Sequence, residues 1–293
     1  SVPDLYCTVR NGATLHILAA SMFRFPIQLL EYINKHQVNA IYWVPSALIL
    51  VANLRALPEV DVTCLKKIMF CGEVMPVKQL NMWRKYVPDA KYVNYYGPSE
   101  TTYASTYYVI DREFSKEEAL PIGNPAINTG VLVLNDRDEL AGVDEIGELC
   151  IKGSGVALGY YNNPEKTAEV FVQNPVNKKY REIIYRTGDL VKWNHLGELE
   201  YVCRKDFQIK HQGYRIELGE IEHGAMSISG MKRVCCLYHD KKQQIVLVYE
   251  GEADAAEVKE GLKTKVPEYM VPGIVHKLDV MPMNANGKID RVL

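Results

Sequence analysis

The sequence predicts an α/β fold with three parts: a partial parallel sheet with flanking helices, an antiparallel β-barrel-like subdomain, and a small C-terminal α+β domain. Strand and helix patterns alternate with short connections through residues 1–115, and short strands without long helices between them follow from Leu120. Alternation favours parallel strands with helices on the sheet faces. Closely spaced short strands favour an antiparallel sheet or barrel.

In the first part, apolar runs indicate the strands and proline indicates where helices begin. Strands are expected at residues 14–18, 38–44, 65–71 and 91–95. Helices are expected to begin at Pro26 and Pro45, because proline fits a first helical turn, and a third helix is expected at 77–86. The Pro26 helix carries apolar residues at helical spacing: Ile27, Leu30 and Ile33.

The later parts show shorter elements. Strands are expected at residues 130–134, 147–151 and 198–202, with a short helix at 164–171 and a hairpin turn at 195–197. Beyond Arg204 the order is a strand at 207–210, a turn at Gln212 and Gly213, a helix at 218–226 and a strand at 245–249. Asp254 and Glu257 resemble a capping box before a helix that stops at Pro267.

The composition is that of an ordinary soluble protein: 293 residues, 47% hydrophobic, 24% charged, with a formal net charge of −2. It gives no reason to expect binding to nucleic acid or insertion into a membrane. The 7 cysteines lack paired spacing, so a disulfide framework is not expected and a reducing, cytoplasmic location fits best.

Two loops at the carboxyl ends of predicted strands contain residues suited to ligand binding. Ligands of open parallel sheets bind beyond these ends. The loops are Cys71 to Glu73 and Asn94 to Thr102, and the second combines a Gly-Pro turn with one carboxylate and several hydroxyls. That chemistry suits a metal-bound polyphosphate beside a flat ring. A single such turn is more commonly a solvated loop, with Glu100 as a surface charge.

Several familiar motifs are absent: a phosphate-binding Gly-x-x-x-x-Gly-Lys loop, Gly-x-Gly-x-x-Gly after a strand, a His-x-x-x-His metal pair and a Gly-x-Ser-x-Gly elbow. Four polar segments remain, at residues 94–102, 185–189, 204–222 and 286–291. Each segment by itself is more often a turn than a site. Their order along one chain is the informative feature.

In this order, and together with residues 147–171, 215–222 and 267–272, the segments resemble those of the adenylate-forming enzymes, which include amino-acid adenylation domains, acyl-CoA synthetases and luciferases. The resemblance covers essentially the whole chain. It implies ATP and Mg²⁺ as cofactors and divides the chain into three. Residues 1–203 form the C-terminal part of a large AMP-binding domain, with 1–115 as the α/β portion and 116–203 as the β subdomain. Residues 204–206 form a hinge and 207–293 a small mobile domain.

The same resemblance assigns roles to individual residues. Tyr96 would stack on adenine, Asp189 would accept hydrogen bonds from the ribose hydroxyls, and Glu100 would hold Mg²⁺ against the phosphates. Ser99 stands where the family usually has threonine and keeps the phosphate-facing hydroxyl. The implied ATP contacts are Gly72, Asn94, Tyr95, Tyr96, Gly97, Pro98, Ser99, Asp189, Arg204 and Lys288.

Lys288 and Glu100 are the implied catalytic residues, Lys288 because it would reach both the substrate carboxylate and the α-phosphate. Asp206 falls at the hinge about which the small domain rotates after adenylation. Gly213 would let the pantetheine arm of a carrier protein pass the backbone for thioester formation. The implied partners are therefore a small amino acid and a phosphopantetheinylated carrier protein.

Residues 1–6, 11–15 and 69–76 resemble the D-alanine–carrier protein ligases. In that group a cysteine at the position of Cys71 packs beside the alanine methyl group, and Met69 and Tyr103 would complete the wall, with Lys288 on the carboxylate. Cys71 is equally an ordinary small residue of a buried strand. There are two alternatives. One is a peptide synthetase domain for another amino acid, and the other is a non-catalytic fragment that binds a nucleotide or a carrier protein.

Two parts of the family's site are expected upstream of Ser1: the glycine-rich Ser/Thr loop around the β- and γ-phosphates, and the aspartate that binds the amino group. The first residues run straight into apolar periodicity, which indicates a fragment. The 293-residue chain alone is therefore expected to adenylate inefficiently.

Overall fold

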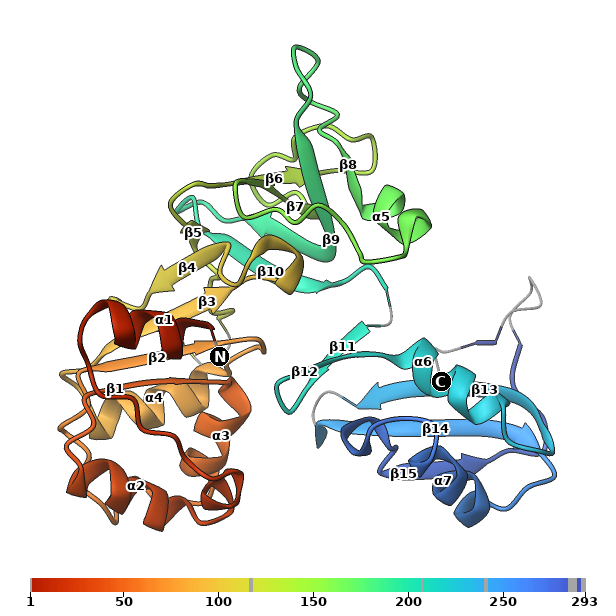
Figure 1. Ribbon diagram of the computed structural model, residues 1–293, viewed down its shortest axis with the longest axis horizontal. Helices are drawn as coiled ribbons and strands as arrows, with labels where there is room; N and C mark the ends of the chain where they lie inside the picture. The colour runs from red at the N-terminus through yellow and green to blue at the C-terminus, as the bar shows by residue number, and fades with distance from the viewer. Residues whose placement is uncertain (1, 116–117, 207, 240–241, 284–288, 291–293) are drawn as a thin grey trace. The chain divides into compact units, whose positions relative to one another are not determined.

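The computed structural model describes residues 2–115, 118–206, 208–239, 242–283 and 289–290 (Figure 1). The chain separates into two compact units, Ser1–Lys205 and Asp206–Leu293. The hinge assigned to residues 204–206 and the boundaries around it stay predictions.

The first unit contains a five-stranded sheet in the order β1-β2-β3-β4-β5. Strands β1 (Ala40–Trp43), β2 (Lys67–Cys71) and β3 (Lys91–Tyr96) are parallel, and β4 (Thr106–Val109) and β5 (Asn124–Pro125) continue antiparallel. The predicted parallel sheet is confirmed, and its strands β2 and β3 end at the two loops selected from the sequence.

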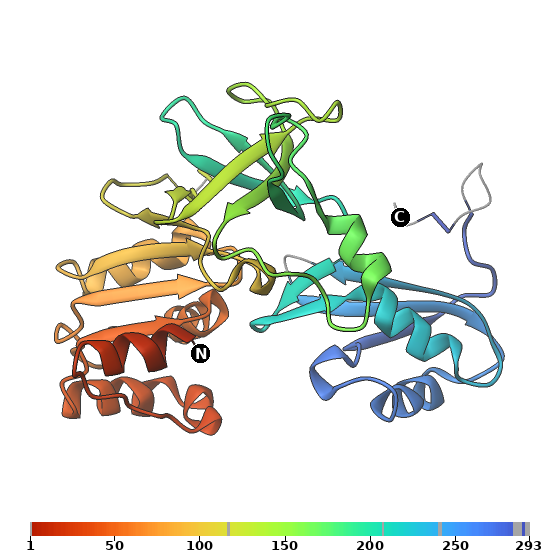
Figure 2. The ribbon, with the colours of Figure 1, turned by 45° about the horizontal axis from the view of Figure 1, so that its top comes forward.

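Three helices cover one face of this sheet: α2 (Pro26–Lys35), α3 (Pro45–Asn53) and α4 (Val77–Tyr86) (Figures 1 and 2). Proline occupies the first turn of α2 and α3 as predicted. Trp83 of α4 is fully buried, and its indole N–H donates to the Leu48 carbonyl at 2.9 Å, which joins α4 to α3. The apolar face of α2 differs from the prediction, since Ile27 is 44% exposed and Leu29 is buried instead.

The predicted strand at residues 14–18 is wrong. This stretch has no regular structure and lies between α1 (Val2–Arg10) and the 3₁₀ helix η1 (Ala20–Arg24). A strand needs a neighbour to pair with and a surface on which its alternating side chains pack. Neither is present here among the described residues: the sheet begins at β1, and Ile17 is 87% exposed.

A second, antiparallel sheet completes the first unit, in the order β10-β9-β7-β6 with β8 paired to β9. Its strands are β6 (Thr129–Leu134), β7 (Gly147–Gly153), β8 (Phe171–Gln173), β9 (Ile183–Trp193) and β10 (Leu199–Arg204), and helix α5 (Pro164–Val170) precedes β8. The predicted antiparallel subdomain is confirmed. Strand β9 is the long central element, although the sequence indicated only a polar segment at 185–189.

The core of the second sheet includes a residue of the first. Leu149, Ile151, Val191 and Leu199 pack together with Tyr96, the last residue of β3. The two sheets therefore meet at the carboxyl end of β3.

The second unit is a small α+β domain, as predicted. A hairpin of β11 (Gln208–His211) and β12 (Tyr214–Glu217) leads into α6 (Leu218–Met226). A three-stranded sheet follows, with β13 (Met231–His239) antiparallel to β14 (Gln244–Gly251) and β14 parallel to β15 (Ile274–Lys277). Helix α7 (Ala255–Lys263) has the predicted capping box but ends four residues before Pro267, and the 3₁₀ helix η4 (Glu268–Met270) follows.

No helix in the described part of the chain has the length and apolar character required to cross a bilayer.

Candidate functional site

The loop after β3 folds tightly on itself. A Cβ on Gly97 would lie 1.9 Å from the Tyr103 carbonyl oxygen and 2.7 Å from the Ser105 nitrogen, so only glycine fits. The Ser105 N–H donates to the Tyr96 carbonyl at 2.8 Å, and the hydroxyls of Thr101 and Ser105 are 2.6 Å apart. The space beside Gly97 is thus filled by the loop's own backbone.

Two consecutive non-glycine residues in this loop have left-handed backbone conformations, Thr102 with φ 58° and Tyr103 with φ 86°. Such conformations carry strain and persist only when surrounding contacts hold them. The Thr102 hydroxyl donates to the Gly155 carbonyl at 2.7 Å, which is one of these contacts. The loop that carries Ser99 and Glu100 is therefore fixed from a neighbouring segment.

A buried polar cluster lies where the two sheets meet. The Tyr96 hydroxyl donates to Asp189 Oδ2 at 2.5 Å, and Arg204 Nη1 donates to Asp189 Oδ1 at 3.0 Å and to the Thr187 carbonyl at 3.1 Å. Tyr96 is 4% exposed and Asp189 2%. Burial, and after it the Asp189 carboxylate, raises the pKa of Tyr96 well above its ordinary value, so the phenol stays protonated as a donor.

An irregularity in β9 presents Asp189 to this cluster. Strand β7 pairs Cys150 with Arg186 and Glu148 with Leu190, so three residues of β9 oppose one of β7 between these pairs. Gly188, in the middle, has φ +72°, which favours glycine. The buried Glu148 carboxylate accepts from the Gly188 N–H at 3.2 Å and from Arg186 Nη1 at 3.0 Å. Glu148 therefore fixes the bulge.

Glu100 is half-buried in the 3₁₀ helix η2 (Ser99–Thr101). Its Oε1 accepts a hydrogen bond from the Tyr160 hydroxyl at 2.7 Å, and its carbonyl accepts from the Ala157 N–H at 2.8 Å. Burial, followed by the bond to Glu100, raises the pKa of Tyr160. The preceding residue, Ser99, is exposed.

A second cluster forms on the face of the first sheet that is opposite to the face carrying Tyr96. Tyr42, Cys71 and Tyr103 interact there, and the Tyr42 and Tyr103 rings cross edge to face with centroids 5.7 Å apart. Tyr95 belongs to this group: its ring centroid lies 6.1 Å from that of Tyr42, and it is paired with Cys71 in the β2–β3 ladder. Burial, and next the neighbouring Cys71, raises the pKa of Tyr42.

The remaining predicted residues of the first unit have structural contacts. The Asn94 amide donates to the Pro121 carbonyl at 2.8 Å, and Gly72 has φ +101° at the end of β2. The Pro98 carbonyl accepts from the Thr101 hydroxyl at 3.2 Å. Met69 is half-buried on the strand that ends in Cys71.

Eight of the sequence-predicted residues of the first unit fall into three groups. Tyr96, Asp189 and Arg204 form one cluster; Cys71, Tyr103 and Tyr95 form another; Glu100 and Ser99 lie on the turn that follows. Asp206 and Gly213 belong to the second unit, where Asp206 Oδ1 accepts from the Gln208 N–H at 3.1 Å and Gly213, with φ +81°, closes the β11–β12 hairpin. Lys288 lies outside the described residues.

Sequence reasoning missed Tyr42, Glu148 and Tyr160. Tyr42 could have been identified from the sequence, because it stands near the carboxyl end of a predicted parallel strand, where ligands of such sheets bind. Glu148 and Tyr160 lie within residues 147–171, which contribute to the family resemblance, but the sequence assigned neither residue a role. Their contacts join residues 40 and 60 positions apart, which no local pattern reveals.

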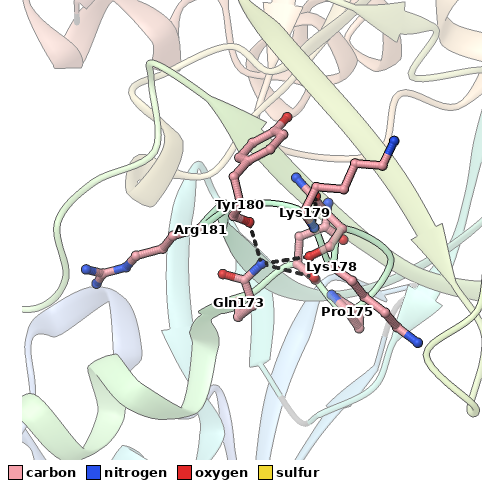
Figure 3. Close-up of a pocket in the computed structure, with 8 residues that line it drawn as sticks. Gln173, Pro175, Lys178, Lys179, Tyr180 and Arg181 are labelled. Atoms are coloured by element: carbon pink, nitrogen blue, oxygen red, sulfur yellow. Dashed lines mark hydrogen bonds between the residues drawn. The ribbon is translucent and has the colours of Figure 1, made fainter.

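A surface hollow of about 430 Å³ lies apart from these clusters, in the loop between β8 and β9 (Figure 3). The side-chain amide of Gln173 holds this loop by donating to three backbone carbonyls, those of Asn174, Asn177 and Tyr180. None of the predicted site residues lines the hollow, and its lining is that of a polar hairpin rather than a reaction site.

Comparison with known proteins agrees with this architecture. Residues 1–161 match the family model described as AMP-binding enzyme. Over 99% of its own length, the chain is 33% identical to bacitracin synthase 1 of Bacillus licheniformis. Over 98% of its own length, it is 33% identical to surfactin synthase subunit 1 of Bacillus subtilis (strain 168). It spans only 6% and 8% of these relatives.

Among solved structures, the Vibrio cholerae adenylation domain AlmE in complex with glycyl-adenosine-5'-phosphate aligns with a TM-score of 0.85 at 24% identity, covering 99% of this chain and 55% of that one. PA1221, an NRPS protein containing adenylation and PCP domains, aligns with a TM-score of 0.80 at 27% identity, covering 91% and 46%. The fold is therefore that of an adenylation domain. The chain belongs to the AMP-binding enzyme family.

Proposed function

We propose that the protein containing this chain activates an amino acid with ATP, giving an aminoacyl-adenylate and pyrophosphate, and transfers the acyl group to the phosphopantetheine thiol of a carrier protein. The observation that carries the proposal is the end of β3. Consecutive residues of a strand face opposite sides, so Tyr95 joins the Cys71 cluster while Tyr96 joins the Asp189 cluster. An acyl group on one side and a nucleotide on the other would meet at this strand end, beside Glu100.

On the nucleotide side, adenine would lie against Tyr96 and the ribose hydroxyls would donate to Asp189. Asp189 suits this role because an ionised carboxylate only accepts hydrogen bonds and has room for more than one at each oxygen. Tyr96 and Arg204 already occupy one position on each oxygen, and the carboxylate is 2% exposed. Each oxygen therefore keeps an acceptor position for a ribose hydroxyl beside its protein donor, and the ligand would have to reach a carboxylate that is buried in this structure.

Mg²⁺ would be held by Glu100 together with the ATP phosphates. The residues fit this ion, because Mg²⁺ is commonly bound through one or two carboxylates plus substrate phosphates and Glu100 supplies a half-buried carboxylate. When bound, the ion would neutralise phosphate charge.

On the acyl side, we propose a small amino acid, with D-alanine as the first choice. Cys71 would contact the side chain, and Met69, Tyr103 and Tyr42 would limit the space around it. The support is the crossing of the Tyr42 and Tyr103 rings beside Cys71, which leaves bulky side chains on both flanks of a small one. A different amino acid is the second candidate, favoured by the similarity to bacitracin and surfactin synthases.

Three further proposed roles fall to residues 206–293. Lys288 would contact the substrate carboxylate and the α-phosphate, Asp206 would act as the hinge, and Gly213 would admit the pantetheine arm. Support for the carrier partner comes from PA1221, whose adenylation and PCP domains occur in one protein.

Amino-acid-dependent pyrophosphate exchange in a protein that carries this chain tests the proposal. D-alanine, L-alanine, glycine and larger amino acids are compared, with ATP and Mg²⁺. The proposal expects exchange with at least one of them and a preference for a small side chain. Binding of AMP without exchange for any amino acid would contradict activation and leave a nucleotide-binding protein.

A Lys288→Ala variant separates the two half-reactions. It is expected to lose exchange while still forming the thioester from supplied aminoacyl-adenylate. If both half-reactions survive the change, the role given to Lys288 is wrong.

A further inference from the structure

The turn that carries Glu100 is braced by residues 155–160. The Ala157 N–H donates to the Glu100 carbonyl at 2.8 Å, and the Gly155 carbonyl accepts from the Thr102 hydroxyl at 2.7 Å. The two backbones touch at Gly155, where a Cβ would lie 2.8 Å from the Thr101 carbonyl oxygen. Residues 155–160, called the brace below, therefore fix the turn by one backbone hydrogen bond, one hydrogen bond from a side-chain hydroxyl and one close approach of the two backbones.

The brace also reaches the side chain of Glu100. The Tyr160 hydroxyl donates to Glu100 Oε1 at 2.7 Å. Tyr160 is itself held: its backbone N–H donates to the Thr167 hydroxyl at 2.9 Å, and its ring packs edge to face on Phe171 with centroids 5.6 Å apart. A donor that is fixed at its backbone and its ring restricts the orientation of the carboxylate it binds.

We propose that Tyr160 is a positioning residue for the Glu100 carboxylate and thereby for the metal ion of the metal–ATP substrate. The inference rests on the proposed function. Its physical basis is that Mg²⁺ demands near-ideal octahedral geometry, so the orientation of a carboxylate ligand matters. Partners that orient a metal-binding carboxylate typically change metal affinity by about 10–100-fold when removed.

The chain offers a matched control in the next residue. Tyr161 is 100% exposed, whereas Tyr160 is half-buried and bonded to Glu100. Tyr160→Phe and Tyr161→Phe make the same chemical change at neighbouring positions. Only the first removes the hydrogen bond to the carboxylate.

The experiment measures binding of Mn²⁺ in the presence of ATP, without an amino acid, by the loss of the electron paramagnetic resonance signal of free Mn²⁺. This readout needs no turnover. Tyr160→Phe is expected to weaken Mn²⁺–ATP binding by about tenfold, and Tyr161→Phe to leave it unchanged. In pyrophosphate exchange, Tyr160→Phe is expected to raise the Mg²⁺ concentration for half-maximal rate while saturating Mg²⁺ restores the rate.

A double variant tests whether Tyr160 acts through Glu100. In a Glu100→Gln background, Tyr160→Phe is expected to weaken metal binding no further, because the group it orients has gone. Equal effects of Tyr160→Phe in both backgrounds would overturn the inference. Gly155→Ala provides an independent disturbance of the brace and is expected to weaken Mn²⁺–ATP binding as well.

The outcomes distinguish this inference from the proposed function. Wild-type protein that binds Mn²⁺–ATP alongside a Tyr160→Phe variant that binds it equally well would overturn the positioning role alone. Wild-type protein that binds no Mn²⁺–ATP would overturn both the proposed function and the inference.

Discussion

At the scale of the residue, Asp189 shows how a buried charge is accommodated. Its carboxylate oxygens each accept one hydrogen bond, from the neutral Tyr96 phenol and from the Arg204 guanidinium. Burying a carboxylate without hydrogen-bond partners costs free energy of folding. With only one of these two donors, one oxygen of Asp189 would lose the hydrogen bond described here. The cluster therefore stabilises the fold, in addition to any role in ligand binding.

Tyr96→Phe is expected to lower the free energy of unfolding by about 1–2 kcal/mol, because it removes a donor to a buried carboxylate while keeping the ring. In the proposed function the ring would still stack on adenine, so AMP affinity is expected to change far less than stability. Urea unfolding and AMP calorimetry measure the two effects. Tyr180→Phe, at an exposed position, is the control for stability; equal stability of the Tyr96→Phe and Tyr180→Phe variants would contradict the prediction.

Glu182 supplies a pH-dependent contribution. Hydrogen bonds from Asn174 first, and then from Lys152 and Asn177, lower the pKa of its carboxyl. A carboxyl whose pKa is lower in the folded than in the unfolded state stabilises the fold fully above the unfolded value of ~4.3. That contribution is lost as the pH falls through the lower folded-state value. The melting temperatures of wild-type protein and Glu182→Gln should thus differ at neutral pH and converge in acid. A difference that grows in acid would contradict this sign.

At the scale of the element, the sequence was sufficient to predict helices whose position depends on interactions between neighbouring residues. Helices α4 and α6 occupy the residues expected from the sequence, and the Asp254–Glu257 capping box begins α7 as predicted. Residues 14–18 show the opposite case, because alternation alone predicts a strand whether or not a neighbouring strand exists. The end of α7 likewise depends on packing rather than on the nearest proline.

Part of the candidate site could be predicted from two motifs, one at the end of strand β3 and one within strand β9. Residues 94–102 and 185–189 could be selected from the chain, but the grouping of Tyr95 with Cys71 and of Tyr96 with Asp189 needed the sheet geometry. The supporting roles of Glu148 and Tyr160 could not be assigned, although both residues lie in the segment 147–171, because their partners are set by tertiary packing.

The β11–β12 hairpin permits a test of its proposed role. Gly213→Ala places a side chain at φ +81°, which costs about 1–2 kcal/mol of strain, and in the proposed function it would also obstruct the pantetheine arm. Gly197, with φ +72° and no atoms near its Cβ position, is a matched glycine of another hairpin turn.

Gly213→Ala is therefore expected to slow thioester formation at least about tenfold while leaving pyrophosphate exchange unchanged. Gly197→Ala should introduce similar strain and affect neither half-reaction. Stopped-flow or quenched assays of each half-reaction measure the outcome. Parallel loss of both half-reactions in the Gly213 variant would refute selective obstruction.

At the scale of the whole molecule, each of the two units has its own core. Leu149 is fully buried in the first unit and Leu262 in the second, in separate hydrophobic clusters. Separate cores favour separate unfolding transitions. Replacing either leucine by alanine should cost about 2–5 kcal/mol within its own unit.

Scanning calorimetry of the full chain should accordingly resolve two transitions, with Leu149→Ala lowering one and Leu262→Ala the other. Each variant serves as the control for the other, since the chemical change is identical. A single transition that both substitutions lower would show that the units unfold as one.

The Tyr96–Asp189 bond joins residues 93 positions apart. Contacts of such long range form late, because the loop between them must first be closed. During synthesis, a nascent chain that ends after β5 would already contain Glu100 and its turn, yet it would lack Asp189, Arg204 and the brace. In the proposed function, retention on an AMP resin would therefore appear abruptly in a series of lengthening chains, near residue 204, and would report completion of the second sheet rather than emergence of the loop after β3.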